Sequence, residues 1–218
     1  MGPVRVAITF DAEHPDRPVG RSGVEEEMLS VLAGASVRAT FFLQGRWVEA
    51  HPDLAARIAG AGHLVGSHSH FHARMPLLTD EGLRADIVQA DRAIREATGV
   101  RPRPWFRCPW GHGARDPRVV MALRRQRYRH VGWDVVAEDW EPGRTADDLV
   151  RDVVAGTRAA GDGAVVLLHA WPAQTLDALP DIILELGNVG AELVTVADLA
   201  HRDLSATADP GTAAENPS

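Results

Sequence analysis

The chain has 218 residues, of which 45% are hydrophobic and 24% charged, and its formal net charge at pH 7 is -7. This balance is typical of a packed globular domain and not of a disordered chain. The negative charge argues against a general nucleic-acid-binding protein, and no apolar run approaches the roughly 20 residues that cross a bilayer.

Short apolar runs alternate with amphipathic stretches along the chain. Buried strands are predicted over residues 4–10, 38–43, 63–68, 104–109, 129–136, 164–169 and 192–196. Helices are predicted over residues 23–35, 51–62, 80–98, 117–127, 146–160 and around 179–187. An alternation repeated about seven times predicts a parallel sheet covered by helices, in one domain over residues 1–200. Residues 201–218 lack periodicity and are predicted to form a disordered tail.

Several helix ends carry sequence signals. Asp116 and Thr145 directly precede two of the helical segments and are typical N-caps. Pro52 suits a first helical turn, whereas Gly62 and Gly99 follow the last helical residues of two segments. These signals predict where four of the helices begin or end.

Two architectures fit this alternation, an open doubly wound sheet and a closed barrel. No glycine-rich phosphate-binding sequence follows the first strand, as a dinucleotide-binding open sheet would require. Reactive side chains instead gather where strands end, and in α/β barrels the loops at that end build the active site. We therefore favour a barrel whose mouth collects Asp11, Glu13, His68, His72, Arg107, Asp139, Trp140 and His169.

The stretch "GSHSHFH" (residues 66–72) places three histidines within seven residues. Two histidines four residues apart are by themselves more often loop polarity than metal ligands, and the serine after the first one excludes the HExxH pattern of zinc proteases. Beside the carboxylates of Asp11 and Glu13, however, His68 and His72 would supply two imidazoles and one carboxylate, as in catalytic zinc sites. The second carboxylate would then be free to act as a base. The middle histidine points away from its neighbours in extended or helical geometry.

Three further residues indicate chemistry or compartment. Arg107 at a strand end is expected to hold a carboxylate through paired hydrogen bonds, and His169 at the end of "AVVLL" suits acid catalysis. The single cysteine, Cys108, excludes an internal disulfide and supports a reducing compartment. Because "MGPVRVAITF" lacks the pattern of an export leader, a cytoplasmic location is expected.

The motifs "TFDAE", "HSHFH", "RCPWG", "DW" and "LLH" occur in this order between Val4 and Leu199. Together they resemble the polysaccharide deacetylases of carbohydrate esterase family four, which include chitin, chitooligosaccharide and peptidoglycan N-acetylglucosamine deacetylases. The resemblance implies an irregular (β/α) barrel with about seven parallel strands, in agreement with the count above. It also implies a divalent metal cofactor, which we expect to be zinc, with cobalt or nickel as alternatives.

The resemblance separates the two carboxylates. It implies that Asp11 is the general base and that Glu13 ligates the metal together with His68 and His72. Most of the family carries the ligating acid directly after the base, where this chain has Ala12. Glu13 is therefore matched to the members that place this acid two residues after the base.

The resemblance also implies catalytic and substrate-binding residues beyond the metal. Arg107 orients the base, and His169 is the general acid, supported by Asp139. Val136 stands where the family's fourth motif has its first Asp, and Ala170 stands where an Asp often follows the acid. The substrate-binding residues that it implies are Trp110, whose neighbouring backbone N–H would help to hold the oxyanion, Trp140, and Leu167 as a wall of the groove.

These residues predict a metal-dependent hydrolase that removes N-acetyl groups from N-acetylglucosamine-containing oligo- or polysaccharides. A carbohydrate substrate is the expected partner, with neither nucleic acid nor a membrane. The same barrel could instead hydrolyse a non-sugar C–N bond, such as a formamide or cyclic amide, or bind carbohydrate without catalysis. Two histidines and one carboxylate also form the facial triad of non-haem Fe(II) oxygenases, which need neither the Asp–Arg pair nor the acid histidine.

Overall fold

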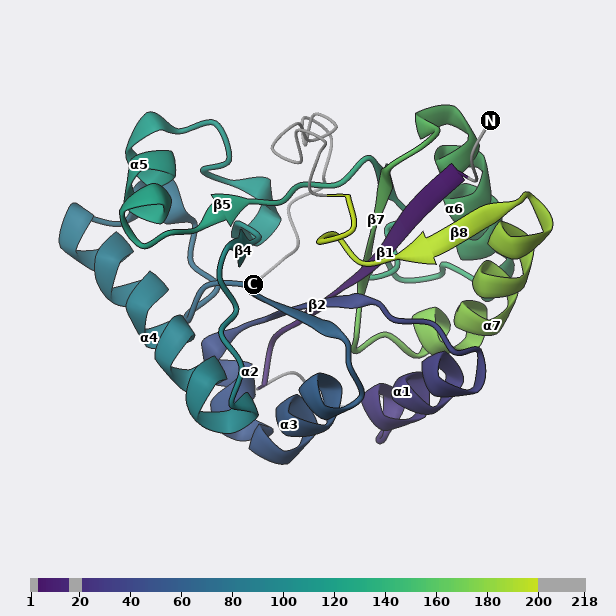
Figure 1. Ribbon diagram of the computed structural model, residues 1–218, viewed down its shortest axis with the longest axis horizontal. Helices are drawn as coiled ribbons and strands as arrows, with labels where there is room; N and C mark the ends of the chain where they lie inside the picture. The colour runs from purple at the N-terminus through teal and green to yellow at the C-terminus, as the bar shows by residue number, and fades with distance from the viewer. Residues whose placement is uncertain (1–3, 16–20, 200–218) are drawn as a thin grey trace.

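The computed structural model describes residues 4–15 and 21–199 (Figure 1). Every strand pair in this part of the chain is parallel. Seven strands are hydrogen-bonded in the order β5-β4-β3-β2-β1-β7-β6, and β8 pairs with β1. The strands are β1 (Val4–Ala12), β2 (Thr40–Leu43), β3 (Leu64–Ser67), β4 (Trp105–Phe106), β5 (Arg129–His130), β6 (Val135–Val136), β7 (Ala164–His169) and β8 (Ala191–Val194). The predicted tail over residues 201–218 lies outside the described residues.

Helices lie around the outside of the strands (Figure 1). They are α1 (Val24–Gly34), α2 (Gly45–Ala50), α3 (Pro52–Gly60), α4 (Asp80–Thr98), α5 (Pro117–Arg125), α6 (Ala146–Ala160) and α7 (Ala173–Asn188), with short 3-10 turns η1 (Met75–Leu77) and η2 (Pro109–Gly111). Six of the seven helices match predicted segments. The sequence did not predict α2, because six residues are too few for helical periodicity to register.

The sheet curls into a barrel. β5 and β6 stand at opposite ends of the path of seven strands, which in a flat sheet would lie about 29 Å apart at ~4.8 Å per strand. Only residues 131–134 separate these two strands along the chain, and that connection reaches at most about 18 Å. The two ends of the sheet must therefore approach each other, and the predicted barrel of parallel strands is confirmed. β5 and β6 do not pair with each other within the described residues, which makes the barrel irregular.

The segment over residues 129–136 forms two strands, so the single strand predicted there was wrong. β5 pairs with β4, whereas β6 pairs with β7. Between them, the Arg107 guanidinium donates to the carbonyl oxygens of Val131 at 3.3 Å and Gly132 at 3.1 Å. These carbonyls are thereby engaged by a side chain instead of a neighbouring strand. The chain thus passes from the β4 side of the sheet to the β7 side within this segment. The apolar pattern does not reveal this, because Val131, Trp133 and Val135 are all buried as in a single strand.

β1 is the central strand on which the site is built. β7 pairs with one edge of β1, from Val6 to Asp11. β8 and β2 share the other edge, since β8 pairs with residues 4–7 and β2 with residues 9–12. Residues 6–12 are all buried, as expected for a parallel strand covered on both faces. Asp11, near the end of this strand, and Glu13, directly after it, therefore emerge at the centre of the barrel end.

Most of the signalled helix ends form where the sequence predicted them, although α3 ends at Gly60, two residues before Gly62. Thr145 and Asp148 make a reciprocal capping box at α6, and Asp116 accepts hydrogen bonds from two backbone N–H groups at the start of α5. Gly99 ends α4 with a φ of 70°, a left-handed conformation that glycine adopts at little cost. No helix in the part of the chain described is long and apolar enough to span a membrane.

Candidate metal centre and catalytic site

The parallel register brings the candidate residues to one end of the sheet. Asp11 is paired with His169 of β7. Ser67, which precedes His68, is paired with Phe106, which precedes Arg107. Four of the predicted side chains therefore come from the carboxyl ends of strands that lie close together in the sheet order, where barrel enzymes carry their active sites.

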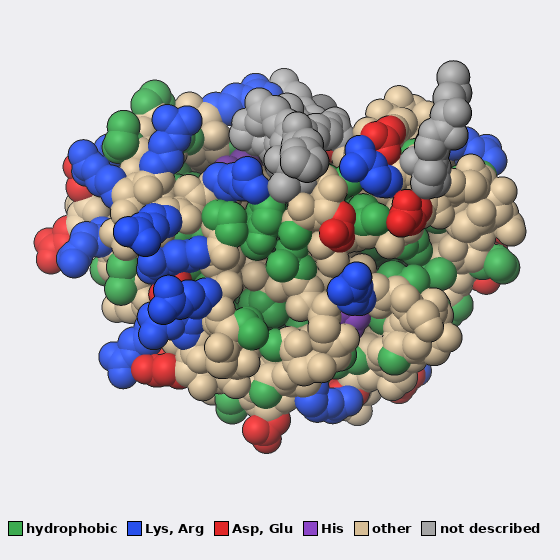
Figure 2. All heavy atoms as spheres, viewed as in Figure 1, with side chains coloured by type: hydrophobic (Ala, Val, Ile, Leu, Met, Phe, Trp, Pro, Cys, Tyr) green, Lys and Arg blue, Asp and Glu red, His purple; other side chains and the backbone are tan. Residues whose placement is uncertain are grey.

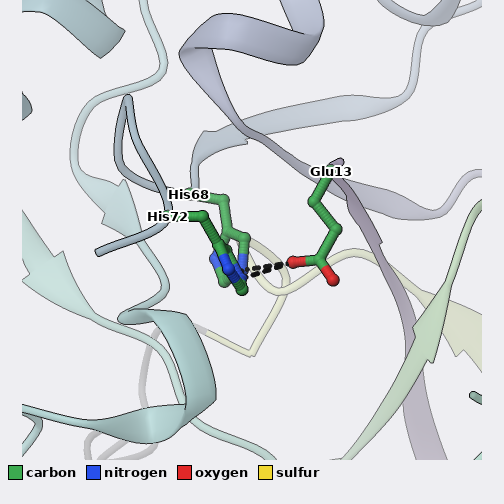
Figure 3. A group of neighbouring side chains, drawn as sticks. All are labelled: Glu13, His68 and His72. Atoms are coloured by element: carbon green, nitrogen blue, oxygen red, sulfur yellow. Dashed lines mark hydrogen bonds and ion pairs between the residues drawn. The ribbon is translucent and has the colours of Figure 1, made fainter. Parts of the chain in front are cut away.

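Glu13, His68 and His72 converge on one point, as Figure 3 shows. All three are buried, and one ligand atom from each lies within 4.8 Å of the others. Glu13 Oε2 lies 3.1 Å from His68 Nε2 and 2.6 Å from His72 Nε2. The two Nε2 atoms are 3.1 Å apart. Among the described residues this is the group of His, Cys, Asp and Glu side chains that can hold a metal ion.

The chemistry of this donor set fits a divalent metal. His68 Nδ1 lies 2.9 Å from the backbone carbonyl oxygen of Arg107, and a carbonyl only accepts, so Nδ1 carries the proton. The lone pair of His68 Nε2 therefore faces Glu13 and His72, which is the arrangement found in metal-ligating histidines. A cation between the three atoms would bind every lone pair at once. Three protein ligands also leave coordination positions open for water and substrate.

The loop that carries His72 is held from α4. The buried Asp86 carboxylate accepts hydrogen bonds from the backbone N–H groups of residues 70 and 71 and from the Ser69 hydroxyl, at 3.0–3.3 Å. The Ser69 oxygen in turn accepts the N–H of His72 at 3.0 Å. Ser69 and His72 have φ values of 66° and 55°, which residues other than glycine seldom adopt. The hydrogen bonds to Asp86 therefore stabilise a costly backbone conformation that turns His72 toward Glu13.

Protonation of the three ligands is set by opposing effects. Burial raises the pKa of Glu13, but the charge of His72 and hydrogen bonds from His14, His68 and His72 outweigh it and hold the pKa well below its ordinary value. Burial lowers the pKa of His72, and Glu13 offsets this only in part. For His68, burial lowers the pKa, but Asp11 and Glu13 outweigh burial and raise it. Metal ligands must be deprotonated, so the raised pKa of His68 would make metal binding at this site depend on pH.

Arg107 clamps Asp11. Its Nη1 donates to Asp11 Oδ1 at 2.9 Å, and both side chains are buried. The expectation of paired hydrogen bonds to a carboxylate was wrong, because Nε and Nη2 donate to backbone carbonyls instead. The guanidinium lies 4.2 Å from the centroid of the Phe42 ring. Burial lowers the pKa of Arg107, and the charge of Asp11 opposes this effect. The clamp leaves Asp11 Oδ2 turned toward the ligand group, 3.6 Å from His68 Nε2.

His169 is fixed by Asp139 on the opposite side of Glu13. Its Nδ1 lies 2.8 Å from Asp139 Oδ1, and its backbone N–H donates to Oδ2 at 2.7 Å. Thr175 donates a further hydrogen bond to Oδ2 at 2.7 Å. Burial lowers the pKa of His169, but Asp139 and, more weakly, Glu13 and Asp11 raise it to about 9. Without a bound cation, this pKa favours the protonated ring at neutral pH, and Nε2 lies 3.8 Å from Glu13 Oε1.

The residues predicted to bind substrate lie beside these imidazoles. The half-buried Trp110 ring has its centroid 4.2 Å from that of His72, and Trp110 adopts a φ of 51°. The half-buried Trp140 ring meets His169 edge-on at 5.0 Å. Leu167 is only 4% exposed and packs in a hydrophobic cluster, so it offers a substrate little surface. Its place as a groove wall stays a prediction.

The sequence profile of the polysaccharide deacetylases matches residues 1–131. The chain belongs to the polysaccharide deacetylase family. A peptidoglycan-N-acetylglucosamine deacetylase of Bacillus cereus is 30% identical over 198 residues, which cover 89% of this chain and 67% of that protein. The Listeria monocytogenes enzyme PgdA is 32% identical over 89% of this chain, but the match spans only 38% of its own length.

Solved structures of this family have the same fold. The family 4 carbohydrate esterase from Streptomyces lividans, in complex with acetate, has a TM-score of 0.77 and 29% identity, covering 96% of this chain and 95% of that one. BA3943 of Bacillus anthracis, described as a family pseudoenzyme, has a TM-score of 0.79 and 29% identity, covering 95% of this chain and 70% of that one. The fold thus accommodates both active and inactive members, so an argument for activity must rest on the site residues.

His14 belongs to this deacetylase site, although the sequence analysis did not select it. Its Nε2 lies 2.9 Å from Glu13 Oε1, and its ring packs against that of His72 at 4.7 Å. Its position directly after Glu13 was the available signal. His14 thus contacts Glu13 Oε1, whereas His68 and His72 face Oε2.

His130 was also missed. Burial, with Arg107 and His68 nearby, lowers the pKa of this side chain to about 3, so the ring is neutral. Its Nδ1 accepts the N–H of Cys108 at 3.2 Å, and the same peptide unit carries the Arg107 carbonyl to which His68 donates. One peptide group therefore links His130 to a metal-ligand histidine. No spacing in the sequence reveals this link, because it runs through the backbone.

Proposed function

We propose that this polysaccharide deacetylase removes N-acetyl groups from N-acetylglucosamine residues of an oligo- or polysaccharide. The observation that carries the proposal is that three groups meet at the carboxyl end of β1: the Glu13–His68–His72 ligands, the Asp11–Arg107 pair and the His169–Asp139 pair. The substrate class follows from the curated relatives, two of which are named as deacetylases of peptidoglycan N-acetylglucosamine.

We further propose that Glu13, His68 and His72 hold zinc, because two imidazoles and one carboxylate are a ligand set of catalytic zinc sites. When bound, such a metal polarises the amide carbonyl and lowers the pKa of water. Cobalt or nickel would suit the same nitrogen and oxygen donors. The identity of the metal is therefore a question for direct metal analysis.

Asp11 is the proposed general base. It takes a proton from the water molecule as the water oxygen forms its bond to the carbonyl carbon of the N-acetyl group. Arg107 donates to Asp11 Oδ1, which leaves Oδ2 on the side of the site where the ligands converge. A backbone N–H beside Trp110 would stabilise the developing oxyanion, which is usually the largest contribution to such catalysis.

His169 is the proposed general acid. It donates its Nε2 proton to the amide nitrogen as the C–N bond breaks, which releases the sugar amine and acetate. Asp139 keeps the ring protonated and oriented through Nδ1. Trp110 and Trp140 flank the ligand and acid imidazoles, where their rings would contact the sugar, with Leu167 packed behind.

A released-acetate assay tests this function. Chitooligosaccharides, peptidoglycan fragments, small formamides and cyclic amides are each offered to metal-free protein with and without Zn²⁺ or Co²⁺. Metal-dependent acetate release from an N-acetylated glycan is the expected result. Turnover of formamides or cyclic amides alone would identify a non-sugar amidohydrolase, and glycan binding without turnover under any metal would identify a carbohydrate-binding barrel.

A further inference from the structure

Exposed arginines are common on this protein, and exposure alone does not mark a binding site. The sequence contains 23 arginines and no lysine. Figure 2 shows many of the basic side chains over the half of the molecule that contains α4 and α5. Arg74 differs from these arginines, because its guanidinium lies over an aromatic ring at the rim of the catalytic site.

Arg74 is close to the metal ligands. Its guanidinium carbon lies 5.5 Å from the centroid of the Trp110 ring, and that ring is 4.2 Å from the ring of His72. These two steps place the guanidinium carbon less than about 10 Å from the centre of the His72 imidazole. One or two linked sugar rings span such a distance. When an N-acetyl group lies at the ligands, the sugar next to it is therefore within reach of Arg74.

The backbone around Arg74 is fixed, and only its side chain is exposed. His72, two residues before it, and Met75, directly after it, are both buried. The Leu77 N–H donates to the Arg74 carbonyl at 2.9 Å, and Arg118 of α5 donates to the carbonyl of Pro76 at 2.8 Å. The position of the guanidinium is thus set by the same loop that positions the ligand His72.

No acidic side chain neutralises Arg74. In the part of the chain that the structure describes, no carboxylate lies within 4.0 Å of its guanidinium, which contacts the Trp110 ring instead. A cation–π contact leaves the N–H groups of a guanidinium available as donors. The His112 ring lies 6.2 Å from that of Trp110, and burial, together with the charge of Arg74, lowers the pKa of His112 below its ordinary value. His112 is therefore neutral at pH 7, and Arg74 supplies the positive charge.

The other aromatic flank of the site has the opposite charge. Trp140, which meets the acid His169 edge-on, donates its Nε1 hydrogen to Glu141 Oε1 at 3.1 Å. Among the described residues, Glu141 has no Arg or His nitrogen within 4.0 Å. Like charges placed together are unfavourable, so an anionic group would be repelled at the Trp140 flank and attracted to the Trp110 flank.

We propose that Arg74 is a specificity-determining residue, which binds a carboxylate on a sugar next to the one that is deacetylated. This inference rests on the proposed function. A guanidinium binds a carboxylate through paired hydrogen bonds, and its single charge balances that of the carboxylate. A phosphate monoester, by contrast, carries nearly two charges at pH 7. Arg74 would therefore favour acidic glycans over neutral chitooligosaccharides.

Arg74→Gln and a matched control variant, Arg129→Gln, test the proposal. Arg129 is also exposed and lies over a tryptophan ring, that of Trp105, at 4.3 Å. It begins β5, however, at the end of the sheet opposite the catalytic site. Both variants thus lose one charge and one cation–π contact. KM and kcat are measured at low salt on a peptide-free peptidoglycan tetrasaccharide, whose muramic acids carry carboxylates, and on its uncharged methyl ester.

Arg74→Gln should raise KM for the acidic tetrasaccharide about fivefold, as the loss of one exposed ion pair would, with kcat unchanged. The difference should vanish in about 0.5 M salt, where exposed charges are screened. KM for the methyl ester should not change, and Arg129→Gln should match the wild type on both substrates. An equal rise on acid and ester would mean that Arg74 only supports Trp110, and it would overturn the proposal.

Binding without turnover separates this inference from the proposed function. Calorimetry gives Kd for the acid and for the ester, with Asp11→Asn as the background to prevent hydrolysis. Tighter binding of the acid, lost when Arg74→Gln is added but not when Arg129→Gln is added, supports the proposal. If this pattern holds and the wild type releases acetate from no glycan, the proposed function fails while the carboxylate site stands. If acetate is released but acid and ester bind equally, the inference fails alone.

Discussion

At the scale of single residues, Asp11 and Glu13 are carboxylates two positions apart with different surroundings. Arg107 holds Asp11, whereas Glu13 faces two imidazoles. Asp11→Asn should lower kcat by roughly 10²–10⁴, the usual contribution of a general base, and keep the metal. Glu13→Ala should weaken metal binding at least tenfold. Metal content after dialysis and released acetate measure the two effects, and the reverse pattern would exchange the two roles.

His169 should set the alkaline limb of the pH profile. A general acid works only when protonated, so the rate falls as pH rises through its pKa. Asp139 raises that pKa toward about 9, and a bound cation at Glu13 would oppose the rise, so the limb should lie between about 6.5 and about 9. Asp139→Asn should move the limb to lower pH. A limb that stays in place in this variant would exclude His169 as the acid.

His130 should act as a positioning residue for the ligand His68. By accepting the Cys108 N–H, it polarises the peptide group whose carbonyl orients His68. Hydrogen bonds to a metal-ligand histidine change metal affinity by about 10–100-fold. His130 is one hydrogen bond more distant from the metal, so His130→Val should weaken Co²⁺ binding by about three- to tenfold. His130→Asn offers an acceptor oxygen near the Nδ1 position and should restore the affinity. Equal Co²⁺ affinity in the Val and Asn variants would assign His130 a packing role.

At the scale of elements, α4 supports the loop over residues 68–72, which we call the metal loop, through the Asp86 carboxylate. Asp86→Ala would leave buried N–H groups without partners, at a cost of about 1–3 kcal/mol in stability, and would release the strained backbone at His72. Metal affinity should therefore fall together with the free energy of unfolding.

Thr145→Ala is the control for that experiment. Loss of its capping box should cost about 1 kcal/mol at α6, which carries none of the ligands, and metal affinity should not change. Denaturant unfolding and a Co²⁺ titration measure the two quantities. If both variants lose free energy of unfolding but keep their Co²⁺ affinity, Asp86 does not position the metal ligands.

At the scale of the whole molecule, metal binding should stabilise the barrel, since its ligands join the loops after β1 and β3. A metal at 100 times its Kd adds about 2.7 kcal/mol, which for a chain of this size raises Tm by roughly 5–10 °C. His68→Ala with His72→Ala should abolish this metal-dependent rise. Differential scanning calorimetry with and without chelator measures it, and a rise retained by the double variant would place the metal elsewhere.

Helices whose sequence pattern involves only neighbouring residues could be predicted from the sequence. The Leu83–Ile94 spacing with Gly99 predicted α4, and Thr145 and Asp116 predicted two helix starts, because propensity and capping act over a few neighbouring residues. The grouping of reactive residues after strands was also readable, since parallel strands end at the same side of a sheet. His68, His72 and one of the two carboxylates were selected on that basis, and the family resemblance chose Glu13 over Asp11. The structure brings Glu13, His68 and His72 together.

Contacts between distant segments could be decided only by the tertiary structure. The apolar pattern of residues 129–136 is that of one strand, yet Arg107 binds the carbonyls at its middle and the chain crosses between two edges of the sheet. The peptide link from His130 to His68 and the hold of Asp86 on the metal loop depend on backbone atoms, which are the same in every residue. The sequence by itself determined which side chains this protein carries to its site and on which elements, because those signals are local. Which partners those side chains meet, and at what angle, was decided by the curling of the sheet, because that brings together residues whose separation along the chain leaves no local signal.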